Sequence, residues 1–396
     1  MKKYKRTIII VMDSLGIGNA VDAKKFNDEG ANTFGHIVDK VPNIKIPTLR
    51  MLGIKDLVPN LSGDKVTHLN SYTFKLNEHS NGKDTMTGHW EMMGILTTKP
   101  FISFTDTGFP EALIKELEEK TGYELIGNYA SSGTEILEKL GEECMNERKL
   151  IVYTSADSVL QLCAHEDTIP VKELYRCCEI AREVCMKPEY RVGRIIARPF
   201  IGKDKNSFKR TPNRHDIALD PTGITAMDIL KNNGYTVSCI GKIADIFNNV
   251  GVSQTQKTIS NVDGMNKTIK EIASTDYEGL CFVNLVEFDS EYGHRRNYNG
   301  YAQAIETFDT QLKELMDIMR DTDLLMITAD HGNDPTWVGS DHTREQVPLI
   351  VYSKQIKDGR YVGERQQFAD MGATVLEDLG LKSDKTMIGT PIKEIL

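Results

Sequence analysis

The residues best suited to chemistry in this sequence are aspartates and histidines that come soon after short hydrophobic runs. Five residues share this character, namely Asp13, Asp289, His294, Asp330 and His331, and His342 follows eleven residues after His331. Carboxylate and imidazole groups bind Mn, Zn, Co or Mg ions, and the sequence alone does not choose among these metals. Six ligands are too many for one catalytic ion, whereas two ions with three protein ligands each keep positions open for phosphate oxygens. The set therefore predicts a two-metal site for phosphoryl transfer.

Each of these residues has a simpler interpretation when it is taken alone. An aspartate directly after a strand is usually a helix cap. A single histidine more often makes a hydrogen bond in the core or lies on the surface. Several aspartates after different strands, accompanied by histidines, favour the metal site over these alternatives.

A two-metal site needs an attacking group, and the polar loop at residues 80–89 is the best place for one. The loop reads Ser-Asn-Gly-Lys-Asp-Thr-Met-Thr-Gly-His and leads into residues 90–93, which could open a helix. A threonine hydroxyl is a weak nucleophile unless a cation lowers its pKa. Thr85 and Thr87 are the candidates, and the alternative is that either one is only a helix N-cap.

The elements that must position these residues alternate between strands and helices, which predicts an α/β fold. Buried strands are expected at residues 7–12, 150–154, 235–240, 280–287, 324–328 and 348–352. A helix with its apolar face formed by Ile305, Phe308, Leu312, Leu315, Met316 and Met319 should cover a parallel sheet. Ligands of such sheets bind beyond the carboxyl ends of the strands, so the aspartates that follow four of the strands can converge: Asp13, Asp157, Asp289 and Asp330.

The region from about residue 100 to residue 215 differs in character from the rest. It contains three helical segments, clustered cysteines and a basic stretch at residues 191–214. We expect an inserted α/β cap domain at 100–215 and a discontinuous catalytic core at 1–99 and 216–396. The seven cysteines form no CxxC pair and no zinc spacing, so we expect reduced thiols.

The composition excludes several classes of protein. With 396 residues, 40% hydrophobic and 27% charged, the chain has the balance of a globular protein with ample core. The net charge of −9 and the absence of a long basic run argue against a nucleic-acid partner. The first hydrophobic run is too short to span a membrane and is not followed by a cleavage-type site. We expect a cytoplasmic protein with no membrane and no obligate protein partner.

The order of these motifs resembles the alkaline phosphatase superfamily, and the details are similar to its phosphopentomutase family. The similarity runs through residues 11–18, 82–91, 154–159, 195–200 and 328–343. The Asp-His-Gly motif is shared widely, whereas residues 82–91 together with Ala-Arg-Pro-Phe at 197–200 are more specific. The resemblance implies an alkaline-phosphatase-like core with a mostly parallel sheet flanked by helices, plus the inserted cap, which would close over the substrate.

The resemblance also implies roles for individual residues. Thr85 would be the phosphorylated nucleophile. One ion would be held by Asp13, Asp330 and His331, and the other by Asp289, His294 and His342. The substrate contacts would come from Asp157, Arg194, Arg198, Arg210 and Lys242.

The activity implied by the resemblance is the interconversion of ribose 1-phosphate, or 2-deoxyribose 1-phosphate, with the 5-phosphate sugar. Manganese is the implied metal, and glucose 1,6-bisphosphate or a similar bisphosphate would prime the enzyme. Such an enzyme serves nucleoside salvage and catabolism.

Other proteins on the same scaffold are alternatives. A phosphatase, a phosphodiesterase or a cofactor-independent phosphoglycerate mutase would share the ligand order. The short chain, the threonine in the nucleophile loop and residues 197–200 argue against the phosphoglycerate mutase. A non-catalytic metal or sugar-phosphate sensor would need neither a nucleophile nor open coordination positions.

Overall fold

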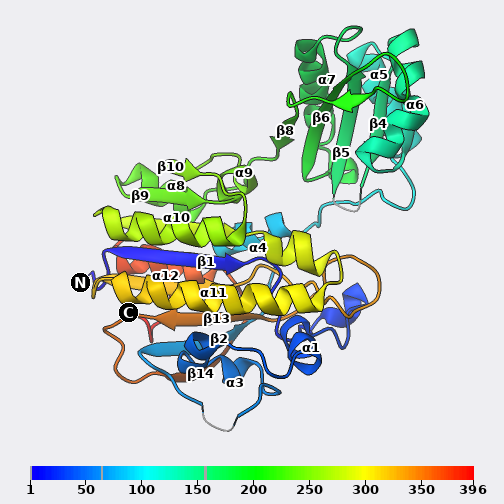
Figure 1. The fold of residues 1–396 in the computed structure, drawn as a ribbon. Helices are drawn as coiled ribbons and strands as arrows, with labels where there is room; N and C mark the ends of the chain where they lie inside the picture. The colour runs from blue at the N-terminus through cyan, green and yellow to red at the C-terminus, as the bar shows by residue number, and fades with distance from the viewer. Residues whose placement is uncertain (1, 64–65, 156–157) are drawn as a thin grey trace. The chain divides into compact units, whose positions relative to one another are not determined.

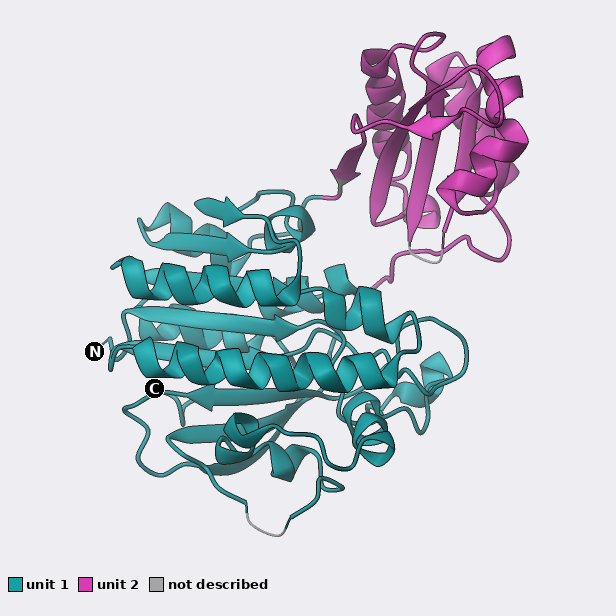
Figure 2. Ribbon diagram, viewed as in Figure 1, with its two compact units in different colours: residues 1–98, 220–396 teal, residues 99–219 magenta. Residues whose placement is uncertain are grey.

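The chain folds into two compact units, each with its own sheet. The computed structural model describes residues 2–63, 66–155 and 158–396. Unit 1 comprises residues 1–98 and 220–396, and unit 2 comprises residues 99–219 (Figure 2). None of the helices in the described residues is long and apolar enough to cross a membrane.

Unit 1 is built on an eight-stranded sheet (Figure 1). Across the sheet the strands are β10 (Gln254–Gln256), β9 (Thr236–Ile240), β11 (Gly279–Leu285), β1 (Arg6–Met12), β12 (Asp323–Thr328), β13 (Val347–Tyr352), β2 (Ser71–Leu76) and β14 (Arg360–Arg365). Strand β13 is antiparallel to β12 and β2, whereas the other neighbours pair in parallel. The predicted α/β fold with a mostly parallel sheet is confirmed.

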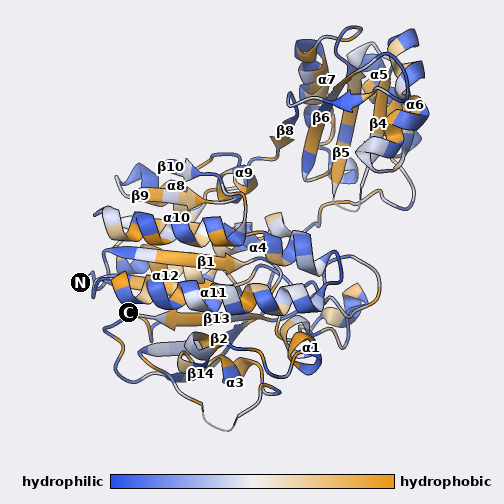
Figure 3. Cartoon of the chain, viewed as in Figure 1, coloured by the Kyte–Doolittle hydropathy of each residue, from blue (hydrophilic) through white to orange (hydrophobic). Residues whose placement is uncertain are grey.

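Helices cover both faces of this sheet. The helices of unit 1 are η1 (Ala23–Phe26), α1 (Thr33–Lys40), α2 (Pro47–Met51), α3 (Ile54–Leu57), α4 (Thr85–Met92), α8 (Ala226–Asn232), α9 (Ile243–Ile246), α10 (Asn261–Ser274), η3 (Phe288–Gly293), α11 (Tyr298–Ile318) and α12 (Asp370–Asp378). Helices α10 and α11 pack side by side on one face, and α8 and α12 pack together on the other (Figure 1). Figure 3 shows the hydrophobic strands between amphipathic helices. The predicted apolar face of α11 is buried, and Met319 caps the end of that helix.

The register of the central strands decides where the site forms. Strand β1 pairs in parallel with β11 on one side and with β12 on the other. Met12 lies opposite Leu285, and Val11 lies opposite Thr328. The three strands therefore end at the same edge of the sheet, and the segments that follow them begin side by side.

Unit 2 has a smaller sheet with three α-helices and one short 3-10 helix among its described residues. Its strands run in the order β3 (Leu125–Ala130), β4 (Leu150–Thr154), β5 (Val159–His165), β6 (Arg194–Ile201) and β7 (Lys209–Arg210), and β8 (His215–Ala218) also pairs with β6. Its helices are α5 (Glu111–Thr121), α6 (Gly133–Glu147), α7 (Val171–Val184) and η2 (Pro188–Tyr190). The seven cysteines of the whole chain are free and buried. They therefore pack in the hydrophobic interior and are not exposed as reactive thiols.

A buried ion pair holds the opposite end of the central strands. The guanidinium of Arg6 donates to both carboxylate oxygens of Asp323, at 3.1 and 3.0 Å, and also to the carbonyl oxygen of Ile272 at 3.2 Å. Both charged side chains are only 2% exposed. The pair joins β1, β12 and α10 at the amino end of the sheet.

We expect Asp323→Ala to lower the free energy of unfolding by about 3–5 kcal/mol, because it leaves the buried guanidinium of Arg6 without its counter-charge. Urea unfolding of the full chain measures the effect. The control is Glu278→Ala, which breaks the exposed pair with Lys2 and should cost less than about 1 kcal/mol. Equal effects for the two variants would contradict this account of the sheet.

Candidate active site

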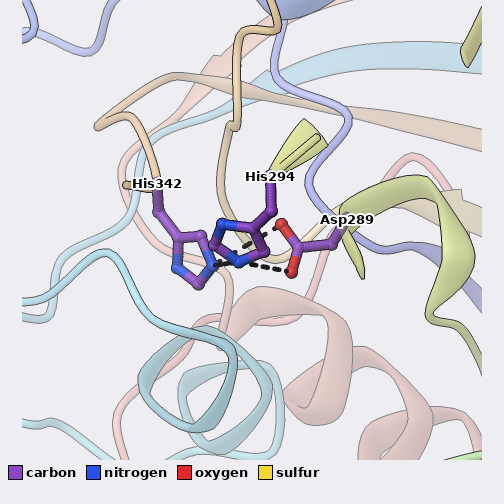
Figure 4. Close-up of side chains that lie close together, drawn as sticks. All are labelled: Asp289, His294 and His342. Carbon is purple, nitrogen blue, oxygen red and sulfur yellow. Dashed lines mark hydrogen bonds and ion pairs between the residues drawn. The ribbon is translucent and has the colours of Figure 1, made fainter. Parts of the chain in front are cut away.

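Two predicted ligands, His294 and His342, lie next to the carboxylate of a third, Asp289. His294 Nε2 lies 3.1 Å from Asp289 Oδ2, and His342 Nε2 lies 3.5 Å from Asp289 Oδ1. The two Nε2 atoms are 3.1 Å apart. Figure 4 shows both imidazoles turned toward the carboxylate. The ligand atoms lie within 4.8 Å of one another, which is the spacing of groups that share one cation.

A short π-helical turn brings Asp289 and His294 together. The backbone N–H of His294 donates to the carbonyl of Asp289 at 2.9 Å, a bond across five residues. In an ideal α-helix these side chains would point about 140° apart. The wider turn of η3 places them on one side, and such turns are common at functional sites.

The other three predicted ligands gather next to this group. Asp13 follows β1, and Asp330 and His331 follow β12. His331 Nε2 lies 3.3 Å from Asp330 Oδ2 and 3.6 Å from Asp13 Oδ1. The ligand atoms of Asp13, Asp289 and His331 also lie within 4.8 Å of one another. The fold thus brings all six predicted ligands into one place.

Each of the three histidines is held by a hydrogen bond on its far side. The Nδ1 atom of His294 donates to the carbonyl of Ser340 at 2.7 Å, and that of His331 to Gly332 at 3.0 Å. His342 Nδ1 donates to the carbonyl of Lys83 at 2.9 Å. Because a carbonyl only accepts, each Nδ1 carries a proton, and Nε2 is the ring atom that faces the centre. Nε2 is therefore the atom through which each histidine could bind a metal ion.

The carboxylates of the site have the character of metal ligands. Asp13 Oδ1 and Asp330 Oδ2 are buried and accept no hydrogen bond from the described residues. Burial, followed by the charges of Asp330 and Asp289, raises the pKa of Asp13 well above its usual value. Burial opposes the charge of Asp330 as well, but His331 and His89 lower its pKa to about 2. A divalent cation would satisfy the orphaned oxygens and remove the repulsion, so the residues fit such a group.

Thr85 lies at the edge of this cluster. It is the first residue of α4, and the helix is capped by Asp84, whose carboxylate accepts from the N–H of Thr87 at 3.0 Å. The helix therefore begins earlier than residues 90–93, and neither Thr85 nor Thr87 is the N-cap. Thr85 Oγ1 lies 3.3 Å from His331 Nε2. The hydroxyl thus combines a position at a helix N-terminus with contact to a predicted metal ligand.

Buried charges hold the loop before Thr85. The carboxylate of Glu91 accepts from the N–H groups of His79 and Ser80, at 2.9 and 2.5 Å. The guanidinium of Arg344 donates to the carbonyl of Gly82 at 2.5 Å and pairs with Glu78. Both Glu91 and Arg344 are buried. The loop is therefore fixed from both sides.

Three residues of the site were not singled out from the sequence. His89 Nδ1 lies 3.2 Å from Asp330 Oδ2, Asn284 donates to Asp13 Oδ2 at 2.8 Å, and Asn333 donates to Asp289 Oδ1 at 2.8 Å. His89 comes four residues after Thr85 on the same helix, and Asn284 is a polar residue in an apolar strand. A histidine one helical turn after the candidate threonine and a single asparagine within an apolar strand are sequence features that point to these two residues.

The predicted substrate-binding residues are not brought together in the same way. Asp157 lies outside the described residues. Arg198 and Arg210 line one cavity of unit 2, and Arg194 pairs with Asp216 at 3.8 Å. Lys242 is the residue before α9 in unit 1. Their roles stay predictions.

Comparisons with known proteins agree on the family. A family model described as the Metalloenzyme superfamily matches residues 5–383. A phosphopentomutase from Clostridium botulinum and one from Agathobacter rectalis are each 52% identical to this chain over 396 residues, covering all of each sequence. The chain belongs to the phosphopentomutase family. It is an isomerase of the alkaline phosphatase-like superfamily, so the resemblance is confirmed and the alternative of a non-catalytic sensor is wrong.

More distant solved structures support the fold. The phosphoglycerate mutase of Leishmania mexicana has a TM-score of 0.53 at 12% identity, covering 98% of this chain and 97% of its own. The PH0037 protein from Pyrococcus horikoshii has a TM-score of 0.50 at 13% identity, covering 97% and 99%. The alkaline-phosphatase-like fold class is confirmed, and the family and the donor groups together indicate divalent metal ions.

Helix α4 packs so closely on Asp330, one of the predicted metal ligands, that residue 88 has no space for a Cβ atom. A Cβ atom there would lie 2.3 Å from the carbonyl oxygen of Asp330. Gly88→Ala should therefore push Thr85 away from His331 and lower turnover by about 100-fold, although alanine favours helix. Steady-state kinetics measure this effect. The control is Gly223→Ala, where the nearest atom would be Ile95 Cδ1 at 3.3 Å. A fully active Gly88→Ala variant would contradict the close packing.

Proposed function

We propose that this chain interconverts ribose 1-phosphate, or 2-deoxyribose 1-phosphate, with the corresponding 5-phosphate through a phosphothreonine at residue 85. The observation that carries the proposal is the contact of Thr85 Oγ1 with His331 Nε2, at 3.3 Å, beside a cluster of six carboxylate and imidazole groups. Full-length identity of 52% to phosphopentomutases supports the substrate class. The reaction would serve nucleoside salvage and catabolism.

Two divalent ions, with manganese as the proposed metal, complete the site. Asp13, Asp330 and His331 would hold one ion, and Asp289, His294 and His342 would hold the other. The support is the set of inward-facing Nε2 atoms and the orphaned oxygens of Asp13 and Asp330. When bound, the ions would lower the pKa of the Thr85 hydroxyl and neutralise charge on the transferred group.

The relay has two equivalent halves. Phosphothreonine 85 gives its phosphoryl group to the free hydroxyl of the pentose monophosphate; the bond from phosphorus to Thr85 Oγ1 breaks as the bond to the sugar oxygen forms. The bisphosphate then presents its other phosphate to Thr85, which takes it up and releases the isomeric monophosphate. Glucose 1,6-bisphosphate or a similar sugar bisphosphate would phosphorylate Thr85 at the start.

The chain's own residues prepare Thr85 for this role. As the first residue of α4, Thr85 lies where the free N–H groups and the helix dipole favour negative charge. Its helix is held against Asp330 by the contact at Gly88. Positioned donors of this kind stabilise charge that builds up in the transition state without reorganising. Phosphate binding by Arg194, Arg198, Arg210 and Lys242, sugar binding by Asp157, and the exclusion of water by the inserted unit remain proposals.

The nucleophile is tested by Thr85→Ala. We expect conversion of ribose 1-phosphate to ribose 5-phosphate to fall on the order of 10³-fold or more, because the attacking oxygen is lost. Thr85→Ser keeps a hydroxyl and should keep part of the activity. Peptide mass spectrometry after incubation with glucose 1,6-bisphosphate should find phosphate on Thr85. The control Thr310→Ala changes an exposed threonine of α11 and should be fully active. Phosphate found only on Thr87 or Ser80 would overturn the assignment.

The metal pairing is tested by ligand removal. Asp289→Ala and His342→Ala should each lower the bound manganese from two equivalents toward one, because each removes one of three ligands of the same ion. Metal analysis after equilibrium dialysis measures the content. Glu291→Ala removes a carboxylate of η3 that pairs with Arg295 and should leave the content unchanged. An unchanged count in both ligand variants would refute the pairing.

A further inference from the structure

The guanidinium of Arg296 links the segments that carry Asp289, His294 and His342, which form one of the two proposed groups of metal ligands. Arg296 lies between η3 and α11, and its side chain donates to oxygen atoms of five residues. These are Gly339 O at 2.7 Å, Gly293 O at 3.3 Å, Asn333 Oδ1 at 2.7 Å, Asp334 O at 2.8 Å and Asp341 O at 3.4 Å. Four of the five acceptors are backbone carbonyls, so the bonds fix the path of the chain itself.

The residues that accept these bonds are neighbours of the ligands around Asp289. Gly293 directly precedes His294, and Asp341 directly precedes His342. Asn333 accepts from Arg296 through Oδ1 and donates through Nδ2 to Asp289 Oδ1 at 2.8 Å. One rigid planar group therefore contacts a neighbour of each of the three ligands.

The backbone at Arg296 gives a second, independent observation. Its φ is +54°, in the left-handed region that favours glycine and that costs an ordinary residue some strain. The chain nevertheless carries an arginine there. The neighbouring Arg295 is 65% exposed and pairs with Glu291 within the same turn. The two arginines thus have different surroundings although they are adjacent.

We infer that Arg296 is a positioning residue that sets the geometry of Asp289, His294 and His342 and thereby the affinity of that group for its divalent ion. The inference rests on the proposed two-metal function. Arg296 reaches the ligands only through the residues beside them, so it is not itself a ligand. Its bonds keep the three ligand atoms in place before the ion arrives, and ligands that are already in place lose less conformational freedom when the ion binds.

The sign of the effect separates positioning from simple electrostatics. A guanidinium repels a cation, so by charge alone the loss of Arg296 would strengthen metal binding. Positioning predicts the opposite. Removing an outer partner of metal ligands typically weakens the metal by about 10–100-fold.

The test measures manganese binding by the full chain, freed of metal by a chelator, using equilibrium dialysis and metal analysis. The main variant is Arg296→Gly, which removes the guanidinium and is compatible with the left-handed backbone. Arg296→Lys keeps the charge without the planar fork. Arg295→Gly is the matched control at the exposed neighbour. Thermal unfolding of each metal-free variant is measured in parallel.

We expect Arg296→Gly to bind one equivalent as the unchanged chain does and the second about 10–100-fold more weakly. Arg296→Lys should resemble Arg296→Gly, because an ammonium cannot reach acceptors on several segments at once. Arg295→Gly should bind both equivalents normally. In a chain that also carries Asp289→Ala, the Arg296→Gly change should have little further effect, because the site on which it acts is already lost.

Four outcomes would overturn the inference. Arg296→Gly could bind both equivalents normally, bind them more tightly, or lose both equally in step with a lower unfolding temperature. A fourth outcome, uptake of only one equivalent by the unchanged chain, would refute the two-metal proposal and the inference together. That result comes from the unchanged chain alone, so the two failures are distinguishable.

Discussion

The site depends on the placing of like charges where water cannot screen them. Asp13, Asp289 and Asp330 follow three neighbouring strands that end at one edge of the sheet, and all three are buried. Burial, followed by the charges of Asp330 and Asp289, raises the pKa of Asp13, whereas His331 and His89 lower the pKa of Asp330. Cations are the general solution to such an arrangement. The metal requirement is thus a consequence of where the fold puts its carboxylates.

Neighbouring backbone groups fix the orientation of the side chains in the site. Backbone carbonyls turn the Nε2 atoms of His294, His331 and His342 inward, and the wide turn of η3 aligns Asp289 with His294. The carbonyl that orients His342 belongs to Lys83, two residues before Thr85. A displacement of the loop before Thr85 would therefore also move His342. The positions of Thr85 and of the predicted ligands thus depend on one hydrogen-bonded network.

The candidate site lies in unit 1, whereas the three predicted substrate-binding arginines lie in unit 2. Unit 1 contains the six predicted ligands and Thr85, which come together through contacts between one sheet and its helices. Unit 2 has a basic cavity lined by Arg198 and Arg210 and a core of its own. The role of these arginines in substrate binding stays a prediction.

Several features were determined by the sequence itself. Strands β1, β4, β9, β11, β12 and β13 were predicted because their sequences are dominated by continuous apolar and β-branched residues, which have few alternatives to burial. The six metal ligands were predicted because their types suit metals and because motif order resembles a known family, and their roles stay predictions. Strands β2, β3, β5 and β6 were not predicted, because short mixed runs such as Leu125–Ala130 lack a clear period.

Only the tertiary structure decided which residues act together. Local sequence suggested a helix near residues 90–93, yet α4 begins at Thr85, because Asp84 caps it and Gly88 lets it lie against Asp330. The parts played by Asn333 and Arg296 were not apparent from the sequence for the same reason. Their partners lie tens of residues away along the chain, and only the parallel register and the loops that follow it bring them within hydrogen-bond distance.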